Sequence, residues 1–134
     1  MQKKFKRSLD ALDRVFDFID SFIQKYKVNE QVAFTMKLVI EELFTNMVKY
    51  NSDNPNEILI DLKHKNQELI MQLVDFDVEP FDITQSPSVD ISQSIKERKV
   101  GGLGLQLVKQ MVDEINYEYK NRNSIITLIK KLGN

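Results

Sequence analysis

A carboxylate, a carboxamide and an ammonium group occur at helical spacing in the stretch EELFTNMVKY. At 100° per residue, Glu42, Asn46 and Lys49 fall within about 60° of one another, away from the apolar positions of the same stretch. Charged residues on a helix usually form only a solvated face. Asparagine, however, is a poor helix-interior residue because its side chain competes for backbone hydrogen bonds. Asn46 therefore makes this face a candidate binding site.

The second candidate site is a cluster of glycines. Three of the four glycines in the chain, Gly101, Gly102 and Gly104, lie within four positions and lead into an apolar-patterned segment. Glycines before a helix let the backbone approach an anion, and the free N–H groups of the helix favour phosphate. No Gly-Lys-Ser/Thr follows and no strand directly precedes, so the stretch is neither a P-loop nor a Rossmann fingerprint. The alternative is that the glycines supply only a turn and close packing.

The elements that position these residues follow from hydrophobic periodicity. A short edge strand is expected at 3–7, a helix from Leu9, and a second helix from the Asn29 cap to about Tyr50. Strands are expected at 57–65, 67–75, 114–120 and 123–132, and a helix at 103–112. The core stripe of the second helix is predicted as Val32, Met36, Val39, Leu43, Met47 and Tyr50.

This element order predicts one α+β domain spanning residues 1–134, a two-layer sandwich of helices against a mostly antiparallel sheet. The polar stretch before the glycines has no clear period, and a loop of that length inside a compact domain is usually functional. Its position suggests a lid hinged over a ligand.

Composition excludes several classes of protein. A formal net charge of −1 without a basic stripe gives no electrostatic footprint for nucleic acid. No apolar run approaches the roughly 18 residues of a membrane span, and we expect a cytoplasmic protein without membrane contact. Cysteine is absent, and the single histidine, His64, is expected at the surface of a strand. Disulfides, thiolate metal sites and histidine-based catalysis are thereby excluded.

Three stretches together carry a family resemblance: EELFTNMVKY, VDFDVEPFD and RKVGGLGLQLVKQMVDEINYEYKNRN. They resemble the anti-sigma-factor serine/threonine kinases, within the superfamily of histidine-kinase, gyrase and Hsp90-like ATPase domains. The resemblance implies a Bergerat-type ATP-binding fold, with a mixed, mostly antiparallel sheet covered on one face by helices. It also implies ATP and Mg²⁺ as cofactors.

The resemblance assigns roles residue by residue. Asn46 matches the asparagine that ligates Mg²⁺ on the nucleotide phosphates, and an amide oxygen suits that hard cation. Glu42 matches the general base on the attacking hydroxyl, and Lys49 would reach a phosphate. The glycine cluster with Leu105 would receive the phosphates and frame an ATP lid at 82–100.

The adenine motif departs from the family pattern. The family has an aspartate with a glycine two residues later, but the matching positions here are Phe76 and Val78. Asp75 and Asp77 flank that slot. Asp75 is the first choice for adenine recognition because it ends a predicted strand, and Asp77 is the second. The Gly-Thr of the family's last strand is also missing, with Thr127 as a substitute polar contact.

By resemblance, the protein would phosphorylate a STAS-type anti-sigma antagonist and bind that antagonist or a sigma factor. Relatives of this kind are commonly homodimers. The altered adenine motif keeps a second class open, a catalytically inactive partner-binding module with weak or no nucleotide binding. A sensor histidine kinase fragment is a weaker alternative, since no phospho-acceptor histidine or dimerisation hairpin precedes the domain. A DNA-acting ATPase is weaker still, because a transducer domain is missing.

Overall fold

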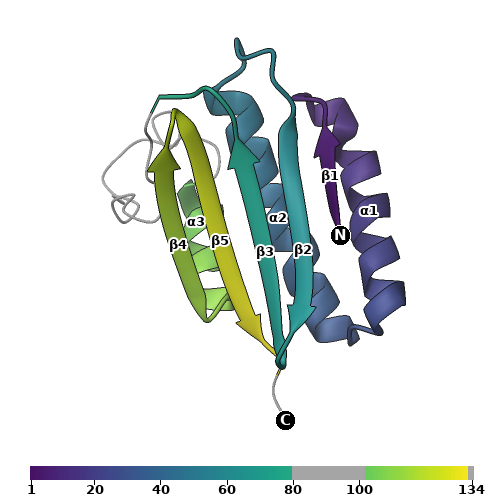
Figure 1. Cartoon of the computed structure of the whole chain (residues 1–134). Helices are drawn as coiled ribbons and strands as arrows, with labels where there is room; N and C mark the ends of the chain where they lie inside the picture. The colour runs from purple at the N-terminus through teal and green to yellow at the C-terminus, as the bar shows by residue number, and fades with distance from the viewer. Residues whose placement is uncertain (80–101, 133–134) are drawn as a thin grey trace.

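Three helices pack against one face of a five-stranded sheet (Figure 1). The computed structural model describes residues 1–79 and 102–132. The predicted lid at 82–100 and Gly101 lie outside this range. The elements in chain order are β1 (Gln2–Phe5), η1 (Leu9–Ala11), α1 (Leu12–Tyr26), α2 (Glu30–Tyr50), β2 (Ile58–Lys65), β3 (Glu68–Asp75), α3 (Gly102–Met111), β4 (Glu114–Lys120) and β5 (Asn123–Lys131).

The strand order is β1-β2-β3-β5-β4, and every pairing among the described strands is antiparallel. The β2–β3 hairpin turns at Asn66 and Gln67, and the β4–β5 hairpin turns at Asn121 and Arg122. All four residues have φ between 54° and 64°, the left-handed conformation that two-residue hairpins require. The predicted α+β fold with a mostly antiparallel sheet is therefore confirmed.

Side-chain caps begin the helical segments where the sequence predicts them. Asn29 accepts a hydrogen bond from the Val32 N–H at 2.9 Å and so starts α2. Ser8 accepts from the Asp10 N–H at 3.2 Å, but it starts a short 3₁₀ turn, and α1 itself begins only at Leu12. The first helix is therefore three residues shorter at its start than predicted.

The core lies between the helices and the covered face of the sheet. Its fully buried side chains include Phe22 from α1, Leu43 from α2 and Ile60 and Leu73 from the central strands. The predicted stripe of α2 is correct as far as Met47. Tyr50 continues the same helical stripe but is 41% exposed, because it is the last residue of α2 and lines a pocket instead of the packed core.

Candidate functional site

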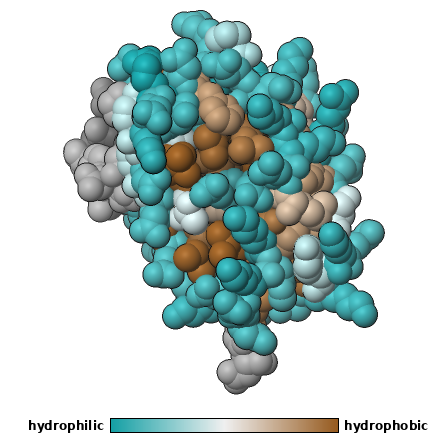
Figure 2. All heavy atoms as spheres, in the orientation of Figure 1, coloured by the Kyte–Doolittle hydropathy of each residue, from teal (hydrophilic) through white to brown (hydrophobic). Residues whose placement is uncertain are grey.

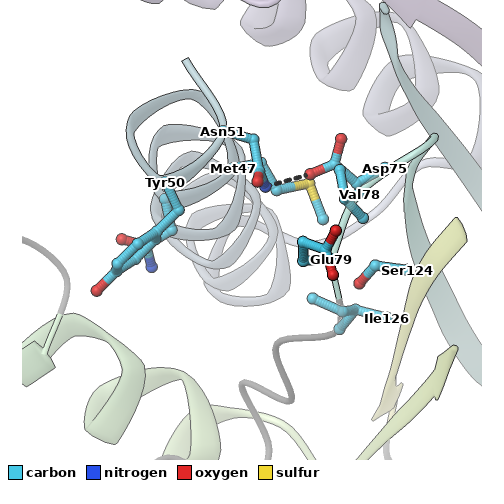
Figure 3. Close-up of a pocket in the computed structure, with 9 residues that line it drawn as sticks. Met47, Tyr50, Asn51, Asp75, Val78, Glu79, Ser124 and Ile126 are labelled. Carbon is cyan, nitrogen blue, oxygen red and sulfur yellow. Dashed lines mark hydrogen bonds between the residues drawn. The ribbon is translucent and has the colours of Figure 1, made fainter. Parts of the chain in front are cut away.

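A pocket opens where the C-terminal half of α2 meets the ends of β3 and β5. Asp75 and Ser124 are paired residues on these neighbouring strands, and both are buried on the face that the helices cover. Figure 3 shows the two side chains approaching the same space, with Asn51 bonded to Asp75. The lining residues are Asn46, Met47, Tyr50, Asn51, Asp75, Val78, Glu79, Ser124 and Ile126.

Asn46 is the most unusual residue of the pocket. Its side chain is only 1% exposed, yet neither its Nδ2 nor its Oδ1 has a hydrogen-bond partner among residues 1–79 and 102–132. Helix α2 turns Asn46 inward against the strand ends, so the alternative of a merely solvated face does not apply to this residue. Buried polar groups without partners cost free energy, so they point to a ligand that is bound in function.

Asp75 is held in the pocket by two side chains from distant parts of the chain. Its Oδ1 forms an ion pair with Arg7, and its Oδ2 accepts a hydrogen bond from Asn51 Nδ2 at 3.0 Å. Arg7 also donates to the backbone carbonyls of Met47 at 3.1 Å and Asn56 at 3.2 Å. The carboxylate is only 2% exposed and has a fixed orientation.

Asp77, the second candidate for adenine recognition, lies outside the pocket. Its side chain is 69% exposed and forms an ion pair with Arg122 at 2.8 Å. The backbone of Asp77 has φ 54°, a left-handed conformation that glycine prefers and aspartate tolerates. Asp77, two residues after Asp75, therefore adopts a backbone conformation that glycine favours. The side chain of the next residue, Val78, packs into the pocket.

Glu42 lies one turn before Asn46 on α2 and is half-buried. Burial raises the pKa of its carboxyl above the ordinary value, Glu41 raises it further, and Lys49 partly offsets both. A raised pKa makes the carboxylate a stronger proton acceptor near neutral pH. Lys49 is exposed at the end of the same helix. The structure therefore keeps both residues near the pocket side of α2 without placing either in its lining.

The glycine cluster begins a helix, as predicted, but two glycines lie inside it. Gly102 is the first residue of α3, and Gly104 and Leu105 belong to the same first turn. The backbone N–H groups of this turn have no partners within an α-helix. Helix α3 packs against α2, which carries Asn46.

Thr127 lies on the opposite face of the sheet from the pocket. Its hydroxyl accepts a hydrogen bond from Gln72 Nε2 at 3.1 Å, on the face that no described helix covers. The expectation that Thr127 replaces the missing Gly-Thr contact is not supported by this position. Ser124, on the covered face of the same strand, lines the pocket instead.

Sequence reasoning missed Arg7 and Asn51. Neither belongs to a motif, and each reaches Asp75 only through the folding of distant segments. His64 is exposed as predicted and stacks on Tyr26, with ring centroids 5.4 Å apart.

Among the described residues, no group of three or more histidine, cysteine, aspartate or glutamate side chains could hold a metal ion. A metal at this pocket would rely on Asn46 and on oxygens of the ligand itself, and the unpartnered amide oxygen of Asn46 fits Mg²⁺ in that way. Within the same described residues, no helix is both long and apolar enough to cross a membrane.

The family described as "Histidine kinase-like ATPase domain" matches residues 5–130, so the chain belongs to that family.

The known proteins that are similar to this chain include one kinase-named protein and two proteins of known structure. A protein from Bordetella bronchiseptica (strain ATCC BAA-588 / NCTC 13252 / RB50) named serine/threonine-protein kinase BtrW is 24% identical over 100 residues, which cover 73% of this chain and 70% of that protein. A chain of the SiaB-SiaC complex from Pseudomonas aeruginosa superposes with a TM-score of 0.64 at 14% identity, over 97% of this chain and 87% of that one. The Acinetobacter baumannii histidine kinase AdeS gives a TM-score of 0.52 at 14% identity, over 100% of this chain and 68% of that one. These structural similarities concern the fold alone.

Proposed function

We propose that this chain is an ATP-dependent serine/threonine protein kinase of the anti-sigma regulatory type. Its substrate is a serine of a STAS-type anti-sigma antagonist, and it binds that antagonist or a sigma factor. The observation that carries the proposal is the buried, unpartnered amide of Asn46, beside Asp75 in a kinase-like ATPase domain. The similarity to a protein named serine/threonine kinase supports the acceptor class. ATP and sigma factors are cytoplasmic, so the proposed kinase acts there.

The roles in nucleotide binding follow from the pocket. Asp75 accepts a hydrogen bond from the adenine amino group, since each carboxylate oxygen has a second lone pair beyond those used by Arg7 and Asn51. Asn46 ligates Mg²⁺, which neutralises charge on the phosphates when bound. The first turn of α3, with Gly102 and Gly104, receives the phosphates together with Lys49.

The proposed reaction is an in-line phosphoryl transfer. The serine hydroxyl oxygen of the antagonist attacks the γ-phosphorus, and Glu42 takes the hydroxyl proton. The bond between the γ-phosphorus and the β–γ bridging oxygen breaks, and ADP leaves. The raised pKa of Glu42 suits this role because it brings the carboxylate closer to the pH at which it works.

One observation favours a second candidate, an inactive partner-binding module. Both oxygens of Asp75 are already engaged by Arg7 and Asn51, and the Val78 side chain occupies pocket space next to them. If these contacts close the adenine subsite, the fold remains while nucleotide binding is lost.

Calorimetric titration with ATP and ADP, with and without Mg²⁺, separates the two candidates. We expect ATP binding that requires Mg²⁺ and weakens at least tenfold in Asn46→Ala, because the cation loses its amide ligand. Asn116→Ala is the matched control, since Asn116 is an exposed strand residue away from the pocket.

Absence of binding up to millimolar nucleotide would contradict the kinase proposal and favour the inactive module. Binding of ATP that is unchanged in Asn46→Ala would remove the role assigned to that residue.

A further inference from the structure

Arg7 lies outside every stretch that carries the family resemblance, yet it reaches the pocket assigned to the nucleotide. The strand register explains how. Phe5, Ile58 and Asp75 form one row across β1, β2 and β3, and β1 and β3 run in the same direction. Strand β1 therefore ends at the same end of the sheet as β3, two strand spacings or about 10 Å away. Arg7 follows two residues later, and its long side chain bridges that distance to Asp75.

The guanidinium of Arg7 is engaged by the protein itself. It forms the ion pair with Asp75 Oδ1 and donates to the carbonyls of Met47 at 3.1 Å and Asn56 at 3.2 Å. The Arg7 side chain is only 3% exposed, and Arg7 is not among the residues that line the pocket. Any effect of Arg7 on a bound nucleotide is therefore transmitted by the groups that it holds.

Arg7 fixes the orientation of the Asp75 carboxylate in two ways. Its Nη2 binds Oδ1 directly. Its Nη1 binds the Met47 carbonyl, which also accepts the backbone N–H of Asn51 at 3.2 Å where α2 ends. The Asn51 side chain in turn donates to Asp75 Oδ2 at 3.0 Å, as Figure 3 shows. Both carboxylate oxygens are thus anchored, and the carboxylate cannot rotate without breaking one of these contacts.

We propose that Arg7 is a positioning residue for recognition of the nucleobase. An ionised carboxylate only accepts hydrogen bonds, and each oxygen of Asp75 retains a lone pair beyond those that Arg7 and Asn51 use. A carboxylate held in this way selects a base that donates an N–H to it, because a base without that donor leaves a buried charged group without its partner. The inference rests on the proposed nucleotide site and adds to that site a residue from the N-terminal segment.

The alternative is that Arg7 only stabilises the fold. In that case, its replacement would weaken the binding of every nucleotide by the same factor. A positioning role instead predicts weaker binding only for nucleotides whose base donates to Asp75. Comparison of ATP with purine riboside 5′-triphosphate, which lacks the exocyclic amino group, separates the two roles.

Calorimetric titration of the full chain with each nucleotide in the presence of Mg²⁺ tests the proposal. We expect the wild type to bind ATP at least about tenfold more tightly than the analogue. In Arg7→Lys this preference should fall to about threefold or less, with the affinity for the analogue unchanged, because a point charge cannot reproduce the directed contacts of the guanidinium. Arg7→Gln, which keeps a donor without the charge, should lose the preference as well. Circular dichroism verifies the fold of both variants.

Arg14→Lys is the matched control, because Arg14 is exposed on α1, and it should keep the full preference for ATP. Asp75→Asn tests the route of the effect. In the Asp75→Asn background, Arg7→Lys should change the preference no further, since Arg7 acts through the Asp75 carboxylate.

Equal weakening of both nucleotides in folded Arg7→Lys would overturn the positioning role, and so would a wild type that binds both nucleotides equally well. Either result would leave the kinase proposal standing. A further loss of preference when Arg7→Lys is added to Asp75→Asn would also overturn the inference, because Arg7 would then act by another route. A wild type that binds neither nucleotide up to millimolar concentration would overturn the kinase proposal together with this inference.

Discussion

Asn46 combines deep burial with two polar atoms that have no hydrogen-bond partner in the described part of the chain, a combination that folding alone does not favour. None of the described residues compensates for the removal of this amide from water. A nucleotide with its cation would supply the missing partners. The residue is therefore expected to reduce the stability of the free protein and to increase it in the complex.

Asn46→Leu tests whether the Asn46 amide lowers the stability of the free protein. We expect the free variant to gain about 1–3 kcal/mol in the free energy of unfolding, because an apolar group of similar size replaces an unsatisfied amide. Urea denaturation without nucleotide measures the change, and Met47→Leu in the same pocket serves as the control with little expected effect. A loss of stability in Asn46→Leu would show that the amide has a structural partner.

Glu42→Gln tests the proposed role of Glu42 as the general base in phosphoryl transfer. We expect the rate of phosphoryl transfer to an antagonist substrate to fall about 10²- to 10⁴-fold, the usual contribution of a general base. Single-turnover transfer from labelled ATP measures it, with Glu41→Gln as the control. Unchanged transfer in Glu42→Gln would exclude the assigned role.

The raised pKa of Glu42 also predicts a dependence of stability on pH. Because its folded pKa lies above the unfolded value, the ionised side chain destabilises the fold at neutral pH. The destabilisation disappears as pH falls below the unfolded pKa. Thermal unfolding should therefore show Glu42→Gln more stable than the wild type at pH 7, with the difference lost in acid.

At the scale of elements, Arg7 joins segments that are far apart in the sequence. Its guanidinium binds Asp75 at the end of β3, the Met47 carbonyl near the end of α2 and the Asn56 carbonyl in the linker between α2 and β2. The Asn54 side chain reinforces the same junction by donating to the Phe76 carbonyl at 2.7 Å. Arg7, in the N-terminal segment of the chain, thus stabilises the pocket wall that the ends of α2 and β3 form.

Arg7→Met should destabilise the protein by about 3–5 kcal/mol, because it leaves a buried carboxylate without its cation. Chemical denaturation measures the loss, and Arg14→Met on the exposed side of α1 should change stability by no more than about 0.5 kcal/mol. In the double variant Arg7→Met/Asp75→Asn, part of the stability should return, since the uncompensated charge is removed. A loss below about 1 kcal/mol in Arg7→Met would show that the pair is not effectively buried.

At the scale of the whole molecule, the two faces of the sheet differ in their surroundings. The covered face supports the core and positions the pocket through Asp75 and Ser124. The open face, which Figure 2 views, presents Ile70, Ile125 and Thr127, and no described helix covers it. Because successive residues of a strand point to opposite faces, the two surfaces are set by alternate residues of β3 and β5.

The sequence by itself determined the element order and the helix cap at Asn29, because these depend on local periodicity and capping chemistry. It also indicated Glu42 and Asn46, since helical spacing and an unusual mid-helix asparagine are local signals. The family followed from the same motifs and is confirmed by the match over residues 5–130.

Only the tertiary structure decided which polar residues reach the pocket. The sequence ranks Asp75 above Asp77 only because it ends a predicted strand, and the structure places Asp75 in the pocket lining while the Asp77 side chain is exposed. Ser124 and Thr127 lie three residues apart on one strand and so point to opposite faces. Arg7 joins the site through contacts across 40 to 68 residues of sequence. Such long-range contacts depend on strand register and packing, which no local sequence pattern specifies.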